Sequence, residues 1–310
     1  MNKVKRSGRL LRASFGVLCR EKRLLLFPLI AAIAIAMIAA FFIAPVVLQD
    51  TGHGYGTTEH WTALVHSLPG RGQAGDLSAA RPHWWIQPLF ATAYFACMVL
   101  ATFCNVAFYH EIMRALAGDA VSLARGFRFA TTRWKAVLLW SLLAGLVGYL
   151  ISAIQERVGF VGKLVTSLIG VAWSVACIFI VPTIIREKET ADPLKLLRSS
   201  AGTLKRTWGE LIIGFVGVEL AFGFVITLLI VLALLTGGVG TTWLCFHFNL
   251  NFWWVGAVVL GEVLLVAVPL GLAGSVLNPV YRCALYTYAT EGVVPEPFDL
   301  ELLDSAWKVK

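Results

Sequence analysis

The chain has 310 residues, of which 58% are hydrophobic and 14% are charged, and its formal net charge is +8. Average soluble domains carry about 25% charged residues, so this much apolar surface excludes an ordinary soluble core and indicates several membrane spans. The basic balance does not indicate nucleic-acid binding, because the basic residues alternate with apolar residues that face a membrane.

Six apolar runs are long enough to cross a hydrocarbon core of about 30 Å as helices. They cover residues 24–48, 86–108, 136–154, 162–185, 211–236 and 254–281. The first run is not followed by a small-residue cleavage site, which predicts a retained span rather than a signal peptide. Gly271, Gly274 and Asn278-Pro279 predict that the last run tilts, bends or breaks near its end.

Lysine and arginine are distributed unequally between the two sides of these spans. One side holds 22 of them and the other holds 4, namely Arg71, Arg81, Arg157 and Lys163. Basic residues are enriched on the cytoplasmic side of membrane proteins. The sequence therefore predicts a multi-pass protein of a bacterial or archaeal cytoplasmic (inner) membrane, with both termini in the cytoplasm.

A basic, half-apolar peptide precedes the first span and recurs before the fifth. Residues 10–20 and 196–206 are identical at seven of eleven positions. The second copy follows Asp192-Pro193, an N-cap and first-turn proline. Its apolar residues recur at steps of three or four on one predicted helical face: Leu194, Leu197, Ala201, Leu204, Trp208 and Leu211.

A third, degenerate copy lies before the third span, where Trp134 aligns with Trp208. Its predicted face is Leu123, Phe127, Ala130, Trp134 and Val137, and the first copy presents Leu11, Phe15 and Leu18. The polar faces are basic, so we expect these helices to lie among anionic lipid headgroups. The predicted membrane-surface residues are Arg9, Arg12, Arg20, Arg125, Arg128, Arg133, Lys195, Arg198, Lys205 and Arg206.

These patterns predict an all-α polytopic membrane protein that forms a single membrane domain. Its six transmembrane helices form three pseudo-repeated units, each an interfacial amphipathic helix plus a two-span hairpin. The units are residues 1–110, 119–187 and 191–288, with an external loop at 49–85 and a cytoplasmic tail at 289–310. The alternative is that the repeated peptide is ordinary topology-determining charge beside the spans.

The tail has its own pattern. Gly292, Pro295 and Pro297 predict a turn after the last span, and Asp299 is positioned to cap a short helix. The acidic residues of that helix, Glu301 and Asp304, are expected to dock on the basic amphipathic helices.

Four polar residues fall within or near the ends of the predicted spans. Glu219 and Glu262 are carboxylates at bilayer depth, and Asn105 and Asn278 follow the cores of their spans. Ionisable groups in a membrane are costly, so they are candidates for function. Glu219 and Glu262 lie at depths that allow a shared polar pocket, while the structural alternative is a hydrogen bond from each to a neighbouring helix.

No catalytic, metal-binding or cofactor-binding pattern is present in the sequence. The six cysteines are scattered, and the histidines of residues 49–85 do not follow a known ligand spacing. We therefore expect no metal and no cofactor, and a solvated external loop. His110-Glu111, at the inner end of the second span, is also expected to be solvated.

Several segments together resemble a family of bacterial and archaeal polytopic membrane proteins known only as a domain of unknown function. They are L24-L-L-F-P-L29, F103-C-N-V-A-F108, the peptides around residues 182–210, and Y281-R-C-A-L-Y-T-Y-A-T-E-G-V-V-P-E-P-F-D299. The repeat is also distantly similar to membrane domains of glycerophosphodiester phosphodiesterases, but the chain lacks a phosphodiesterase domain. The resemblance implies a six-span inner-membrane protein and supplies no activity.

Three functions follow from these observations, in order of preference. The first is a non-enzymatic scaffold or partner subunit that organises lipid or protein, with a protein partner or a homo-oligomer. The second is a transporter or lipid-handling protein with a polar intramembrane site at Glu219 and Glu262. The third is a membrane-embedded enzyme acting on lipid, for which the sequence offers no convergent catalytic set.

Overall fold

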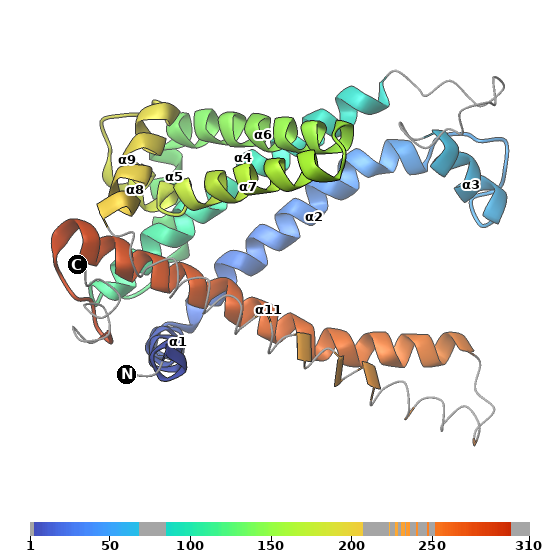
Figure 1. Cartoon of the computed structure of the whole chain (residues 1–310). Coiled ribbons are helices and arrows are strands. Elements are labelled where there is room, and N and C mark those ends of the chain that lie inside the picture. Colours follow the sequence, from blue (N-terminus) through green and yellow to red (C-terminus); the bar gives the residue numbers. More distant parts are fainter. Residues whose placement is uncertain are drawn as a thin grey trace.

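A computed structural model describes residues 3–67, 85–206 and 252–298, with single positions between 223 and 247. Every regular element in these described ranges is a helix (Figure 1). The helices are α1 (Lys3–Arg20), the 3-10 helix η1 (Lys22–Leu25), α2 (Leu26–Val47), α3 (Thr58–Ser67), α4 (Ile86–Leu116), α5 (Leu123–Thr132), α6 (Trp134–Arg157), α7 (Phe160–Ala176), α8 (Ile180–Arg186), α9 (Pro193–Arg206) and α11 (Phe252–Glu291). The all-α prediction is confirmed.

Five stretches of helix are long and apolar enough to cross a membrane. They are Lys22–Val47, Ile86–Leu116, Trp134–Arg157, Phe160–Arg186 and Val263–Glu291. Only 11–33% of the residues in their apolar windows are buried inside the protein, so most of this apolar surface faces outward. The protein therefore has the helices of a multi-pass membrane protein. The predicted span 211–236 lies almost entirely outside the described residues, so the count of six and the three-unit organisation stay predictions.

Three helices differ from the spans expected from hydropathy. Helix α4 continues past residue 108 to Leu116, because its last two turns also pack in the core, and it is followed by Gly118 with a φ of +92°. The predicted fourth span is split into α7 and α8 by a turn at residues 177–179. Helix α11 is continuous through both of its prolines, so the last run does not break at Asn278-Pro279, and the tilt or bend stays a prediction.

The core of the described residues gathers at one end, which we call the packed end. It comprises α1, α5, α8 and α9, the N-terminal parts of α2 and α6, and the C-terminal parts of α4 and α11. Helices α1, α5, α8 and α9 lie on the left of Figure 1. The largest wholly buried apolar side chains there include Phe27, Ile112, Phe179, Ile184 and Leu285. Away from this end, α2 and α11 diverge in Figure 1. The packed end is therefore where the helices are held together.

Helix α4 is central to this arrangement, because it contacts α2, α5, α6, α8 and α11. The three amphipathic helices each lie against the inner part of a span: α5 against α4, α9 against α8, and α1 against α11. Each of these three spans also contributes to the buried core. The amphipathic helices thus cover a core made from span ends.

The predicted apolar faces of α1 and α9 are only partly buried in the protein. In α1, Ser14 and Leu18 are buried whereas Phe15 is 51% exposed, and in α9 the equivalent Ser200 and Leu204 are buried whereas Leu194 is 62% exposed. Leu18 and Leu204 therefore turn toward the protein, whereas Phe15 and Leu194 of the same predicted apolar faces lie on its surface. A small serine allows close packing against a span, and this decides which side turns inward.

In α5 the predicted face is largely correct. Ala130 and Val137 are buried, and Leu123 and Phe127 pack against the core. Trp134 is 55% exposed and is the exception.

The predicted turn after the last span is present. Gly292 has a φ of +67°, and the amide of Phe298 donates to the carbonyl of Pro295 at 2.9 Å. Phe298 is buried, and Pro297 lies beside Gly16 of α1. The start of the tail therefore packs on the N-terminal helix. Asp299, Glu301 and Asp304 lie outside the described residues.

The external loop contains one ordered element. Helix α3 begins at Thr58, and its His60 is fully buried. The ring of His60 lies 2.6 Å from Thr51 Oγ1 through Nδ1 and 3.2 Å from the Val47 carbonyl through Nε2. This histidine fastens α3 to the end of α2, so the expectation of a fully solvated loop is wrong at this residue.

Candidate functional site

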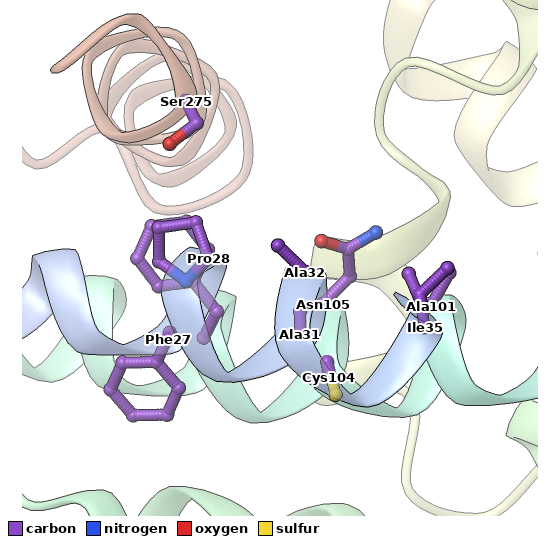
Figure 2. Close-up of a pocket in the computed structure, with 10 residues that line it drawn as sticks. Phe27, Pro28, Ala31, Ala32, Ile35, Ala101, Cys104, Asn105 and Ser275 are labelled. Carbon is purple, nitrogen blue, oxygen red and sulfur yellow. The ribbon is translucent and has the colours of Figure 1, made fainter. Parts of the chain in front are cut away.

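A cavity of about 280 Å³ lies between α2, α4 and α11 (Figure 2). It is lined by Phe27, Pro28, Ala31, Ala32, Ile35, Ala101, Cys104, Asn105, Phe108 and Ser275. Small side chains on the facing surfaces of α2 and α4 leave this space open, since three of the lining residues are alanine. Its size is close to the lower limit for pockets that bind small molecules.

Asn105 and Ser275 place polar groups at the cavity, one from α4 and one from α11 (Figure 2). The Ser275 hydroxyl donates to the Leu272 carbonyl at 2.7 Å, so it is already engaged. Asn105 is exposed, and its amide has no hydrogen-bond partner among the described residues. An amide offers two donors and one acceptor. The cavity can therefore hold an apolar group and hydrogen-bond one polar atom beside it.

The other predicted intramembrane residues are not brought to this cavity in the described structure. Asn278 is partly buried in α11 and does not line the cavity. Glu219 lies outside the described residues. For Glu262 the structure gives the helical backbone of α11 and not the side chain. The shared pocket of Glu219 and Glu262 therefore stays a prediction.

A buried ion pair joins α4 to α5. The side chain of Glu111 is fully buried, and its two oxygens accept hydrogen bonds from Arg125 Nε at 2.9 Å and Nη2 at 2.6 Å. The Glu111 carboxylate also accepts from the Ser122 amide at 2.8 Å, and the His110 ring lies 3.1 Å away. The hydrogen bond that Arg125 donates to Glu111 raises the pKa of Arg125 above its usual value. The expectation that His110-Glu111 is solvated is wrong.

Close backbone contact accompanies this ion pair. A Cβ atom on Gly126 would lie 2.9 Å from the Ala107 carbonyl oxygen and 3.1 Å from Phe27. The His110 ring stacks on Phe129, with centroids 4.0 Å apart. Helix α5 is therefore held on α4 by charge, by close packing and by ring stacking.

Arg133 is also buried, although the sequence predicts it at the membrane surface. Its guanidinium donates to four carbonyls that follow or end α8: Ile184 at 3.0 Å, Glu187 at 2.6 Å, Lys188 at 2.5 Å and Thr190 at 3.0 Å. The last carbonyls of a helix lack hydrogen-bond donors within the helix. The guanidinium of Arg133 supplies these donors at the end of α8. Burial lowers the pKa of Arg133. The prediction that the Arg133 side chain lies at the membrane surface is wrong.

A second junction joins α9 to the ends of α8 and α7 in a similar way. Ser199 donates to the carboxylate of Glu187, and Ser200 donates to the Ala176 carbonyl at 2.8 Å. When Trp134 is aligned with Trp208, Ser199 corresponds to Arg125 and Ser200 to Gly126. In both junctions an acid near the end of a span accepts from the same position of the next amphipathic helix. Arg186 and Glu291 add an ion pair between α8 and α11.

The remaining predicted surface cations have side chains at the surface of the packed end. Exposed are Arg9, Arg12, Arg20, Arg128, Lys195, Arg198 and Lys205. Arg20 also donates to the Ala115 carbonyl at 2.5 Å. Arg125 is partly exposed, and the side chain of Arg206 is outside the description. Their contact with lipid stays a prediction.

Sequence reasoning missed Glu111, and one signal was available. Glu111 is an acid that follows an apolar run directly, and Arg125 lies fourteen residues later on the next amphipathic helix. No pattern within the sequence distinguishes Arg133 from its exposed neighbours, because its partners are carbonyls of a distant helix end.

Comparison with protein families matches residues 87–295 to a family described as a family of unknown function (DUF6159). The match covers the described helices from α4 to α11 and the turn after α11. Neither a curated protein nor a solved structure matches the chain. The distant similarity to membrane domains of glycerophosphodiester phosphodiesterases stays a prediction.

Proposed function

The chain belongs to this family of unknown function, and from its geometry we propose that it is a non-enzymatic membrane scaffold or partner subunit. The observation that supports this function is the packed end. Polar junctions with buried groups tie two of the amphipathic helices, α5 and α9, to the ends of spans, and the exposed side carries basic residues. Such an end is suited to hold other components against the cytoplasmic surface of a cytoplasmic membrane.

The buried polar contacts of the packed end favour a surface of fixed shape. Glu111 and Arg133 are buried and nearly all of their polar atoms have partners. A satisfied buried polar network fixes one relative position of the elements that contribute to it. A surface of fixed shape that carries positive charge binds anionic headgroups or an acidic protein partner without rearrangement.

A second candidate function is lipid handling or transport, and the cavity at Asn105 favours it. A polar amide without a described partner, placed between three spans, is a typical feature of a site for a membrane-soluble ligand. The carboxylates Glu219 and Glu262 belong to this candidate as further predicted groups. The repeats of known transporters are commonly two-fold and inverted, which favours the scaffold over this candidate.

Native mass spectrometry of the full chain, released from its membrane in nanodiscs without delipidation, tests both functions. The scaffold predicts a retained protein subunit or a second copy of the chain. A stoichiometric lipid or small molecule that is lost in Asn105→Ala, and in the cavity-filling variant Ala101→Leu, contradicts the scaffold and supports lipid handling. Ala40→Leu, at an exposed position of α2 that does not line the cavity, is the matched control.

A further inference from the structure

A long apolar groove runs between α4 and α6 on the outward side of the spans. It has a volume of about 840 Å³ and is lined by Ala91, Thr92, Phe95, Ala96, Val99, Leu100, Phe103, Trp134, Val137, Leu138 and Leu142. The one hydroxyl among them, on Thr92, already donates to the Pro88 carbonyl at 2.8 Å. The groove walls therefore offer apolar contact only.

Aromatic side chains line the groove at two levels. Away from the packed end, Phe95 lies against Gly145, where an added Cβ would be 2.9 Å from its ring. At the packed end, Phe103 stacks on Phe127 of α5 with centroids 6.1 Å apart, beside Trp134. The lining residues of α4 extend from Ala91 to Phe103, which is about 18 Å at 1.5 Å per residue. The groove is therefore about as long as one leaflet of a core of about 30 Å.

A cation lies at one mouth of the groove. The ammonium of Lys135 is 5.8 Å from the centroid of the Trp134 ring, and Trp134 itself lines the groove. Residues 120–155 contain no aspartate or glutamate. Of the four basic residues there, Arg125 and Arg133 are engaged with protein groups, whereas Arg128 and Lys135 are exposed. The positive charge is therefore available at this mouth and absent along the walls.

We propose that the groove between α4 and α6 binds one anionic glycerophospholipid, with an acyl chain along the groove and the phosphate beside Lys135. Charge complementarity favours this occupant. A neutral acyl chain alone would leave the Lys135 ammonium without an anionic partner, and an apolar protein helix in the groove would bury the ammonium without a counter-charge. Tryptophan is common at the level of lipid headgroups, which agrees with Trp134 at the mouth. This site is separate from the Asn105 cavity, and it rests on the membrane location alone, not on the scaffold role.

The test uses the full chain in nanodiscs with equal amounts of phosphatidylglycerol and phosphatidylcholine, followed by native mass spectrometry. We expect one retained phosphatidylglycerol per chain. A basic residue near an anionic headgroup contributes about 1 kcal/mol, so Lys135→Gln should lower the ratio of retained phosphatidylglycerol to phosphatidylcholine about five-fold. Lys195→Gln, which removes an exposed cation from α9, should leave this ratio unchanged.

A second pair of variants tests the groove itself. Leu100→Trp fills the groove and should abolish retention of the lipid, whereas Leu139→Trp, on an exposed α6 position outside the groove, should not. Equal retention of the two lipids by the wild type overturns the proposal, as does an equal effect of Lys135→Gln and Lys195→Gln. A second copy of the chain retained in place of lipid also overturns it. A lipid that is retained by Asn105→Ala and lost from Leu100→Trp is bound in this groove and not in the Asn105 cavity. The two variants therefore distinguish failure of this proposal from failure of the scaffold function.

Discussion

Glu111 shows how a charged residue is accommodated at the end of an apolar helix. Its carboxylate is fully buried and has hydrogen bonds to Arg125 and to the Ser122 amide. Taking a charge out of water costs several kcal/mol, which a close partner and further hydrogen bonds offset. Arg125 keeps 37% of its side chain exposed, so the solvent screens part of the interaction. The pair therefore serves to set the position of α5 on α4 more than to add net stability.

Replacing one partner of this pair should be more harmful than replacing both. We expect Glu111→Gln to lower the free energy of unfolding by about 1–3 kcal/mol, because Arg125 loses its counter-charge and one carboxylate oxygen is lost as an acceptor. The double variant Glu111→Gln/Arg125→Gln should recover part of this loss. Thermal unfolding in nanodiscs measures both.

Arg114→Gln is the matched control, because it breaks the exposed ion pair with Asp119. Exposed pairs contribute about 0–1 kcal/mol. Equal losses for Glu111→Gln and Arg114→Gln would show that burial of Glu111 has no energetic consequence.

At the scale of the element, the amphipathic helices pack through their small residues. Ser14, Gly126 and Ser200 occupy equivalent positions in α1, α5 and α9, and all three are buried. Large apolar residues such as Phe15 and Leu194 remain on the outer surface. A helix that lies at a membrane surface has apolar neighbours on two sides, namely the protein and the lipid. Small residues then face the protein, where backbones approach closely, and large ones are left for lipid.

The close contact of Gly126 with α4 leads to a prediction for α5. Gly126→Ala should destabilise the protein by about 1–3 kcal/mol, because the new methyl group would meet the Ala107 carbonyl and the Glu111 side chain, each at 2.9 Å. Gly202→Ala in α9 has open space around it, and alanine favours a helix over glycine by about 1 kcal/mol. Gly202→Ala should therefore be neutral or stabilising in the same thermal assay. A loss for Gly202→Ala that matched the loss for Gly126→Ala would contradict this packing.

The whole molecule is held together at one end. Helices α4, α8 and α11 meet there, and α1, α5 and α9 enclose them. The last helix and the first are adjacent, since α1 lies against α11 and the start of the tail packs on α1. The start of the tail, as far as Phe298, therefore belongs to the packed end.

Two deletions separate the parts of the tail. Removing residues 295–310 takes away the buried Phe298 and the contact of Pro297 with Gly16. Loss of a buried phenylalanine costs about 3–5 kcal/mol, so the melting temperature should fall clearly. Removing residues 299–310 keeps these contacts and should cost less. A shorter deletion that destabilises as much as the longer one would favour docking by the acids Glu301 and Asp304, and unchanged stability in both would rule out any docking of the tail.

The sequence by itself determined the class of protein, the positions of the five spans that the structure describes, and the start of α9. These features depend on local properties: hydropathy over about 20 residues determines whether a helix can span a membrane, and capping residues such as Asp192 determine where a helix begins. Only the tertiary structure decided that Glu111 and Arg133 are buried and which face of α1 and α9 turns inward. The partners in these contacts are 14 to 57 residues away or on other helices. No periodicity within one helix encodes a carbonyl at the end of another, so charge counting assigned Arg133 to the membrane surface.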